Sequence, residues 1–183
     1  MARLNWRAWA TDQEQLDRLH LLEKVSLFSG LSRRQLGKLL VKLFEKAYQP
    51  GETIFLEGEP AKALFIVLHG TVSILHAGKL GEEPVATLTP GAYFGELALI
   101  DDLPRSATAR ADEHSTLLIL YKSHFDDLIE GHSSIAIRVM GNLLKALAGY
   151  VRVAHARRAG HPATLADAPL PVETAQKPSD GSR

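Results

Sequence analysis

The 183-residue chain contains no cysteine, which excludes a disulfide framework, a thiolate nucleophile, an iron–sulfur cluster and a zinc site built on cysteine. It also lacks long apolar runs: each spans only a few residues, whereas a helix that crosses a bilayer needs about 20. The first residues carry charges throughout, unlike the apolar core of a secretory signal peptide. These absences predict a cytoplasmic protein with one globular core.

Net charge is absent as well, because 21 basic residues balance 21 acidic ones. The balance is uneven, since residues 132–159 contain five basic residues and no acidic one. Nucleic-acid binding needs a concentrated positive surface, and only this stretch offers one. Basic residues near the C-terminus of a helix are also favoured by the helix dipole. We therefore expect no nucleic-acid partner.

Two helix starts are visible near the beginning of the chain. Thr11 and Ser32 are each followed three residues later by Glu or Gln, the spacing of a capping box, in which side chains and backbone donors satisfy each other. The pattern predicts helices over about 12–24 and 33–44.

A long helix is predicted near the other end, over residues 134–158. Apolar residues recur there at alternating spacings of four and three, which is typical of a helix that packs on a partner helix. These residues are Met140, Leu144, Leu147, Val151 and Ala154. We expect a homodimer through residues 134–158. Residues 159–183 hold four of the nine prolines and few large apolar residues, a composition that predicts a disordered tail.

Between Tyr48 and Tyr121 the sequence consists of short apolar runs separated by glycines, such as AlaLeuPheIleVal and ThrLeuLeuIleLeu. Many short strands with regular turns predict a β-sandwich or barrel, most simply a jelly roll of about eight strands. The predicted fold class is α+β, mainly β: an eight-stranded jelly-roll β-barrel flanked by N-terminal helices and a long C-terminal helix.

One segment, residues 93–111, has the pattern of neither a strand nor an ordinary turn. Gly95 allows close approach of a ligand, and the following GluLeuAlaLeuIle has the composition of one helical turn with free N–H groups for an anion. Arg105 follows Pro104, and its guanidinium beside such amides would bind a phosphate. A carboxylate only accepts hydrogen bonds, so Glu96 suits sugar hydroxyls. Phosphate and ribose together predict a nucleotide.

This segment resembles the phosphate-binding cassette of cyclic-nucleotide-binding domains, the family of the bacterial catabolite activator protein and the regulatory subunit of protein kinase A. Residues 94–111 satisfy the family pattern throughout. An upstream pattern of the family, from Ile54 to Gly70, is also satisfied, with one departure at Phe55. Two matches in the right order identify the chain as a member of this family.

The resemblance covers about residues 22–158, which implies a binding domain that includes the long helix. An N-terminal arm or helix over 1–21 precedes this domain, and the tail 159–183 follows it. Transcription factors of the family continue with a helix-turn-helix module of about 70 residues, for which the tail is too short. The expectation is a stand-alone sensor domain.

Carried over by position, the resemblance implies a ligand contact for most of the cassette. Glu96 would accept a hydrogen bond from the ribose 2′-hydroxyl, and Arg105 would pair with the cyclic phosphate. Tyr150, on the long helix, would lie near the base. Two interpretations of its ring are equally open: stacking on the base, or packing within the protein. The implied ligand-binding residues are Gly95, Glu96, Leu97, Ala98, Arg105, Ser106, Ala107 and Tyr150.

The function implied by the resemblance is a cyclic-nucleotide receptor that signals to a separate partner through its C-terminal helix. Cyclic AMP is favoured over cyclic GMP as the ligand, because guanine-selective members often carry Thr at the position of Ser106. Two alternatives stay open: a nucleotide-independent interaction scaffold of the same fold, which docks through the Trp6 and Trp9 arm or the basic helix, and a DNA-associated regulator remnant.

Catalytic and metal-binding patterns are missing from the sequence. No His-x-His pair and no nucleophile elbow occur, although the chain has eight histidines. His69 and His76 fall in neighbouring predicted strands, but they lack the additional ligands that a jelly-roll metal site uses. We therefore expect neither enzymatic activity nor a bound metal.

Overall fold

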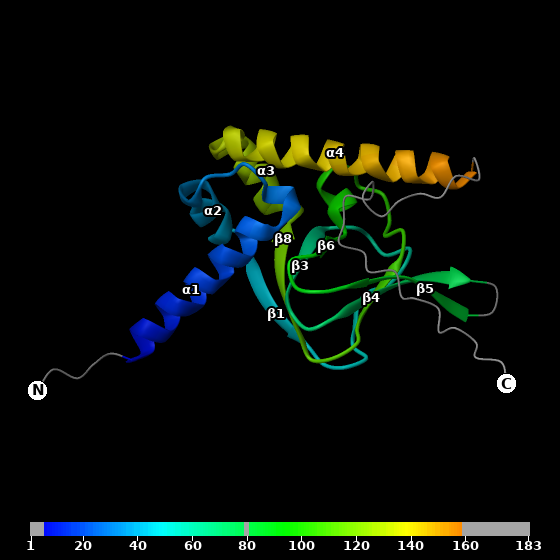
Figure 1. Ribbon diagram of the computed structural model, residues 1–183, viewed down its shortest axis with the longest axis horizontal. Coiled ribbons are helices and arrows are strands. Elements are labelled where there is room, and N and C mark those ends of the chain that lie inside the picture. The colour runs from blue at the N-terminus through cyan, green and yellow to red at the C-terminus, as the bar shows by residue number, and fades with distance from the viewer. Residues whose placement is uncertain (1–5, 79–80, 159–183) are drawn as a thin grey trace, which may run out of the picture.

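The computed structural model describes residues 6–78 and 81–158, in which helices at both ends of the chain pack around a β structure (Figure 1). The N-terminal helical elements are α1 (Trp6–Lys24), the 3-10 turn η1 (Ser26–Phe28) and α2 (Arg33–Leu40). The C-terminal helices are α3 (Lys122–Gly131) and α4 (Ser133–Arg158).

Eight strands and a second 3-10 turn lie between the helices in the described part of the chain. The strands are β1 (Phe44–Tyr48), β2 (Thr53–Phe55), β3 (Ala63–His69), β4 (Val72–Gly78), β5 (Gly81–Leu88), β6 (Tyr93–Phe94), β7 (Thr108–Ala111) and β8 (Ser115–Tyr121). The 3-10 turn η2 (Glu96–Leu99) follows β6 directly.

The strands form two antiparallel sheets with the orders β1-β8-β3-β6 and β2-β7-β4-β5. Early and late strands alternate in each sheet, because β1 pairs with β8, β2 with β7, β3 with β6 and β4 with β5. This order is that of a double-sheet jelly roll. It confirms the predicted fold class.

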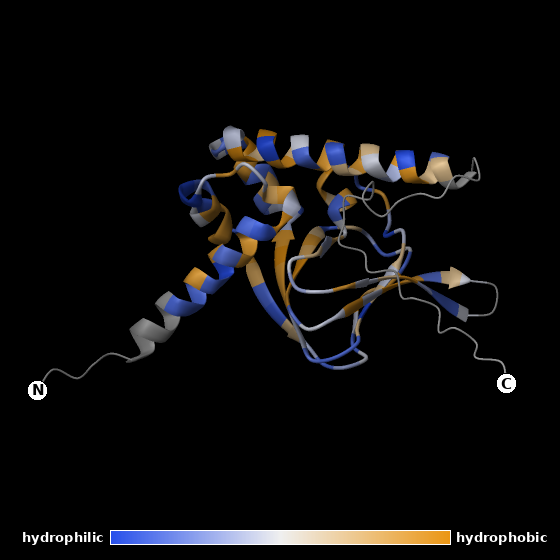
Figure 2. Cartoon of the chain, in the orientation of Figure 1, coloured by the Kyte–Doolittle hydropathy of each residue, from blue (hydrophilic) through white to orange (hydrophobic). Residues whose placement is uncertain are grey.

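Strand β3 separates two hydrophobic cores, since successive side chains of a strand point to opposite faces. Phe65 and Val67 face the other sheet and belong to the core inside the jelly roll. Leu64 and Ile66 face outward and pack against the helices, where Leu143 of α4 joins the same cluster. Figure 2 shows apolar residues concentrated in these central strands and on the facing sides of the helices. Both faces of the sheet are therefore covered.

The local signals near the N-terminus are confirmed at one helix and wrong at the other. Ser32 and Gln35 form the predicted capping box at the start of α2. Helix α1 begins at Trp6, so Thr11 lies inside it and is not a cap. Proline and glycine are absent from residues 6–11, and the helical pattern continues through them.

Helix α2 is also shorter than predicted, because it ends at Leu40 rather than residue 44. The Lys42 amide donates to the Leu39 carbonyl at 2.8 Å in a closing turn. Phe44 then starts β1 and pairs with Ile119 of β8. Sheet pairing overrides the local helical pattern at this point.

Helix α4 confirms the predicted long helix and lies along one side of the jelly roll (Figure 1). Its buried face consists of Ile135, Ala136, Val139, Leu143 and Ala146. The side-chain amide of Asn142 donates to the carbonyls of Leu27 and Ser29, both at 2.9 Å, and so fixes α4 to η1. Within residues 6–78 and 81–158, no helix combines the length and apolar character needed to span a membrane. The predicted tail lies outside the described residues.

Candidate ligand-binding site

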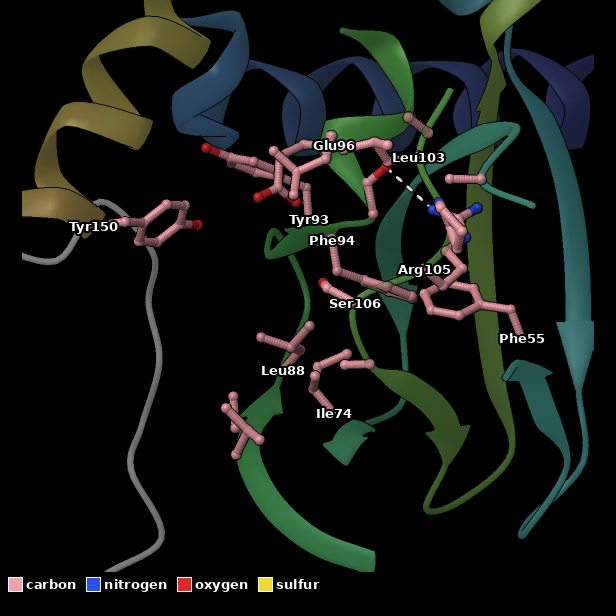
Figure 3. A pocket seen from close by; sticks show the side chains of 18 of the residues that line it. Phe55, Ile74, Leu88, Tyr93, Phe94, Glu96, Leu103, Arg105, Ser106 and Tyr150 are labelled. Carbon is pink, nitrogen blue, oxygen red and sulfur yellow. Dashed lines mark hydrogen bonds between the residues drawn. The ribbon is translucent and has the colours of Figure 1, made fainter. Parts of the chain in front are cut away.

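A cavity of about 510 Å³ lies between η2, the β4–β5 hairpin and the C-terminal part of α4 (Figure 3). Its volume is in the range of small-molecule sites, about 300–1,000 Å³. The structure brings together all of the ligand contacts implied by the resemblance. They line this one cavity: Gly95, Glu96, Leu97, Ala98, Arg105, Ser106, Ala107 and Tyr150.

Gly95 shapes the cassette through its backbone. It has a φ of +71°, in the left-handed region, and precedes the first residue of η2. A Cβ atom at this position would lie 2.5 Å from Nη1 of Arg105 and 3.1 Å from the carbonyl oxygen of Ala63. Glycine is therefore required for the conformation of the chain and for the space that Arg105 occupies.

Arg105 is the buried cation of the cavity, with 8% of its surface exposed. Nη1 donates to the carbonyl of Gly95 at 3.2 Å, and Nη2 donates to the carbonyl of Ala63 at 2.8 Å. Its Nε has no partner among the described residues, which also place no carboxylate within ion-pair distance of the guanidinium. The charge is therefore desolvated and has no counter-ion among the described residues.

The electrostatic surroundings of Arg105 agree with this geometry. Burial lowers the pKa of Arg105, and the more distant carboxylates of Glu59 and Glu96 oppose that shift. A guanidinium remains protonated in proteins, so the shift measures how poorly the site solvates the charge. A bound phosphate would supply the missing compensation through charge-assisted hydrogen bonds.

Glu96 is the first residue of η2 and supplies the carboxylate of the cavity. Burial raises its pKa, while its own backbone N–H and the charge of Arg105 oppose the rise. Figure 3 shows its carboxyl group on the same side of the cavity as the Tyr93 ring, with Tyr150 of α4 facing both across the opening. The carboxylate is thus placed to accept hydrogen bonds from a hydroxyl-bearing ligand.

Tyr150 reaches the cavity from α4, and its buried hydroxyl has no partner among the described residues. Burial, followed by the charges of Glu96 and Tyr93, raises its pKa. The hydroxyl therefore stays protonated and can both donate and accept. Val153 and Ala154, one turn further along α4, also line the cavity.

The remaining positions of the cassette divide between the rim and the core. Ser106 is exposed and Ala107 is half-buried, and both follow Arg105 along the cavity wall. Leu97 is exposed, whereas Ala98 is fully buried against the jelly roll.

Sequence reasoning did not identify the apolar wall of the cavity. This wall includes Ile74, Val85, Ala86 and Leu88 of the β4–β5 hairpin. No local motif marks these positions, because their placement depends on how β5 pairs with β4, including a register shift between Ile74 and Leu75. Phe55 also lines the cavity, and its departure from the upstream family pattern was a visible signal.

The fold and the cavity define a class of protein: a jelly-roll domain with a cavity suited to a small anionic ligand that carries hydroxyl groups. One wall holds a buried cation and a carboxylate, and the opposite wall is apolar. Residues 45–132 match the family model described as "Cyclic nucleotide-binding domain". The chain belongs to the cyclic nucleotide-binding domain family.

Known members give the same assignment. The chain is 30% identical to a cyclic nucleotide-binding-like protein from Brucella abortus, with a TM-score of 0.56 over 62% of this chain and 98% of that one. It is similar to potassium channel SKOR of Arabidopsis thaliana, with 33% identity over 136 residues, which are 74% of this chain. It is also similar to a cAMP-dependent protein kinase regulatory subunit of Yarrowia lipolytica, with 36% identity over 108 residues, which are 59% of this chain.

The matched regions are small parts of these last two proteins. The chain spans 16% of the length of the channel and 28% of the length of the regulatory subunit. The likeness therefore concerns one part of each of these proteins.

Proposed function

We propose that this protein is a receptor for a cyclic mononucleotide, with cyclic AMP as the preferred ligand and cyclic GMP as a possible one. The observation that carries the proposal is the state of Arg105: a buried guanidinium with no ion pair among the described residues and an unpartnered Nε. Such a group costs folding free energy unless a ligand anion compensates it. A cyclic phosphate carries the single negative charge that fits.

The other cavity residues then take separate roles toward the nucleotide. Glu96 accepts a hydrogen bond from the ribose 2′-hydroxyl, while Ser106 and the amide of Ala107 complete the phosphate contacts. Gly95 and Leu97 supply the turn and a backbone contact. The buried side of η2, at Ala98, seats the cassette against the jelly roll.

The apolar wall and the hydroxyl groups of the cavity would select the base of the nucleotide. Ile74 and Leu88 offer the base an apolar contact, and Tyr93, Ser106 and Tyr150 line the cavity with side chains that carry hydroxyl groups. Ser106 lacks the methyl group of the threonine that guanine-selective members often carry. Together with the likeness to a cAMP-dependent kinase subunit, this favours cyclic AMP.

We infer that α4 transmits binding to a separate partner in the cytoplasm. Tyr150, Val153 and Ala154 of this helix line the cavity, so a nucleotide there contacts the helix directly. About two turns earlier, Asn142 ties the same helix to η1. A ligand that contacts the C-terminal half of α4, while Asn142 holds the middle of the helix, can shift the population of α4 between two positions.

Calorimetric titration of the whole chain tests the receptor proposal. We expect cyclic AMP to bind with a dissociation constant in the micromolar range, about 8 kcal/mol of binding free energy. Cyclic GMP should bind more weakly, and adenosine, which has no phosphate, should give no measurable heat. Absence of heat and of thermal stabilisation with both cyclic nucleotides would reject the proposal and favour the interaction scaffold.

A homodimer through residues 134–158 is the second part of the proposal. Ile137, Leu144 and Val151 are spaced by seven residues and are 71%, 63% and 56% exposed on the outer side of α4. This heptad stripe is what a second α4 would bury. Met140 and Leu147 of the predicted seam instead pack partly against the core of their own chain.

Leu144→Glu should convert the dimer to a monomer, because it puts a charge in the centre of the stripe. Sedimentation equilibrium measures the mass directly. Val41→Glu is the matched control, since Val41 is 83% exposed and lies at the end of α2, away from the stripe. A wild-type monomer at high protein concentration, or a dimer that survives Leu144→Glu, would contradict this interface.

A further inference from the structure

Phe55, the one departure from the upstream family pattern, lies directly against the buried cation of the cavity. The Cζ atom of Arg105 is 4.1 Å from the centre of the Phe55 ring and 5.5 Å from that of Phe65. We propose that Phe55, supported by Phe65, is a positioning residue that holds the Arg105 guanidinium in place for the ligand phosphate. We call this pair of rings the aromatic shelf. The inference rests on the proposed function and adds a residue to it.

The shelf is fixed from behind by the core of the jelly roll. The Phe55 and Phe65 rings are 5.5 Å apart and tilted by 44°. Phe65 in turn stacks on Phe94 at 5.2 Å and 13°, and both of these rings are buried. A ring in such a cluster has little rotational freedom, so the group that rests on it is also restrained.

An irregularity of β2 brings Phe55 to this place. The register of β2 against β7 shifts between Thr53 and Phe55, the signature of a bulge. Ile54 and Phe55 both pack against the inner core, although successive residues of a regular strand point to opposite faces. Bulges re-aim side chains in this way and are frequent next to functional sites.

The backbone of Arg105 is held to the chain segment that follows β2. The Arg105 amide donates to the Glu59 carbonyl at 2.8 Å, and the Gly58 amide donates to the Arg105 carbonyl at 2.9 Å. Main-chain hydrogen bonds therefore anchor Arg105 to the segment that directly follows Phe55. Figure 3 shows the Arg105 side chain extended over the Phe55 ring.

Stacking on a ring face suits a phosphate-binding arginine, because it leaves the N–H groups at the edge of the guanidinium free. Two of these groups donate to the carbonyls of Gly95 and Ala63. The other three of its five N–H groups, Nε–H among them, donate to no described residue and remain for an anion. The aromatic faces attract the cation where no carboxylate of the described residues pairs with it.

Loss of the ring should weaken phosphate binding by loosening Arg105. Without the ring, only the carbonyls of Gly95 and Ala63 restrain the Arg105 side chain, which then samples more rotamers and contacts more water. The ligand would have to order this side chain on binding. We expect Phe55→Leu to weaken cyclic AMP binding about tenfold, within the range of a partly desolvated cation–π contact. Phe55→Tyr keeps the ring and should stay within about threefold of wild type.

The test combines titration calorimetry of the whole chain with a spectroscopic readout of Arg105. In the wild type and in Phe55→Tyr, nitrogen-15 relaxation of the Arg105 side chain should report a restrained guanidinium, and in Phe55→Leu the guanidinium should become more mobile. A ring that only fills space would leave the mobility of Arg105 unchanged when leucine replaces it. Phe55→Met, whose longer unbranched side chain reaches further into the space of the ring without a π face, replaces the leucine variant if that variant does not fold.

The outcomes separate the two levels of the proposal. Wild-type protein that binds no cyclic nucleotide overturns the proposed function and this inference with it. Wild-type binding together with unchanged affinity in Phe55→Leu overturns the aromatic shelf alone. Equal loss of affinity in the leucine and tyrosine variants also overturns the shelf, because it would make the exact packing of phenylalanine decisive and not its ring face.

Discussion

Arg105→Ala should lower the affinity for cyclic AMP by at least about 100-fold, the largest effect of any single substitution in the cavity. Charge-assisted hydrogen bonds contribute about 1.5–3 kcal/mol each, so the loss of two to a phosphate corresponds to this factor or more. The aliphatic alanine side chain cannot reach the ligand. Titration calorimetry should show no measurable heat at ligand concentrations that saturate the wild type.

The same substitution should leave the fold intact, which makes the binding result interpretable. Alanine removes donors from the carbonyls of Gly95 and Ala63, a loss that destabilises the folded state. It also removes a buried cation without an ion pair, and this change stabilises the folded state. The two effects oppose each other, so the melting temperature should change by only a few degrees, as for about 1 kcal/mol in a domain of this size.

Arg110→Ala is the matched control for Arg105→Ala. Arg110 lies on the neighbouring strand β7 and pairs with Glu82, to which its two terminal nitrogens donate at 2.6 and 2.9 Å. This ion pair is on the surface, away from the cavity residues. The control should bind cyclic AMP like the wild type. Wild-type affinity in Arg105→Ala would instead mean that the cassette does not bind the phosphate.

The cassette was predictable from the sequence because its chemistry is contiguous. Gly95, Glu96 and Arg105 lie within eleven residues, and a short turn of fixed geometry holds the first two in any context. The positive φ of Gly95 and the turn that starts at Glu96 agree with the local pattern. The capping box at Ser32 was readable for the same reason, since it involves residues three apart.

Other parts of the site depend on pairing between distant segments, which the sequence does not display. The apolar wall exists because β4 pairs with both β5 and β7, with a register shift against β5 between Ile74 and Leu75. The inward position of Phe55 depends on a bulge that no local composition marks. Tyr150 reaches the cavity only because α4 is fixed to η1 more than 110 positions earlier in the chain.

Helix α4 shows how one sequence pattern can combine residues that make different contacts. The spacing of Met140, Leu144 and Leu147 predicted one seam for a partner. In the structure the helix has two apolar stripes: a buried one, which includes Val139 and Leu143, and an exposed one centred on Leu144. Met140 and Leu147 lie between them and are half-buried. A single period cannot distinguish a stripe that faces the chain's own core from one that faces a second molecule.

Glu96→Gln should have opposite effects on stability and on ligand binding. Burial raises the pKa of Glu96 above its ordinary value of 4.5, so the folded protein holds this proton to higher pH than the unfolded chain does. Ionisation then costs folding free energy as the pH rises through the folded pKa. Glutamine has nearly the same shape and no proton to lose. The variant should therefore melt at a higher temperature than wild type at pH 7, and the difference should vanish below pH 4.5.

Binding should change in the other direction, because a carboxylate is the stronger acceptor for the ribose hydroxyl. Hydrogen bonds to a charged group contribute about 1.5–3 kcal/mol and neutral ones about 0.5–1.5 kcal/mol. The difference corresponds to about tenfold weaker binding of cyclic AMP. Calorimetry and thermal melts on the same samples measure both effects.

Glu57→Gln provides a control of opposite sign. The backbone N–H of Ala77 and then the side chain of His76 lower the pKa of Glu57, whose carboxylate lies outside the cavity. A lowered pKa contributes stability above the unfolded value and loses it as the pH falls. Glu57→Gln should thus lower the melting temperature at pH 7 and leave cyclic AMP affinity unchanged. If the Glu96 carboxylate served stability alone, Glu96→Gln would also lower the melting temperature at pH 7. A carboxylate that serves ligand binding instead makes the folded protein less stable until the ligand binds.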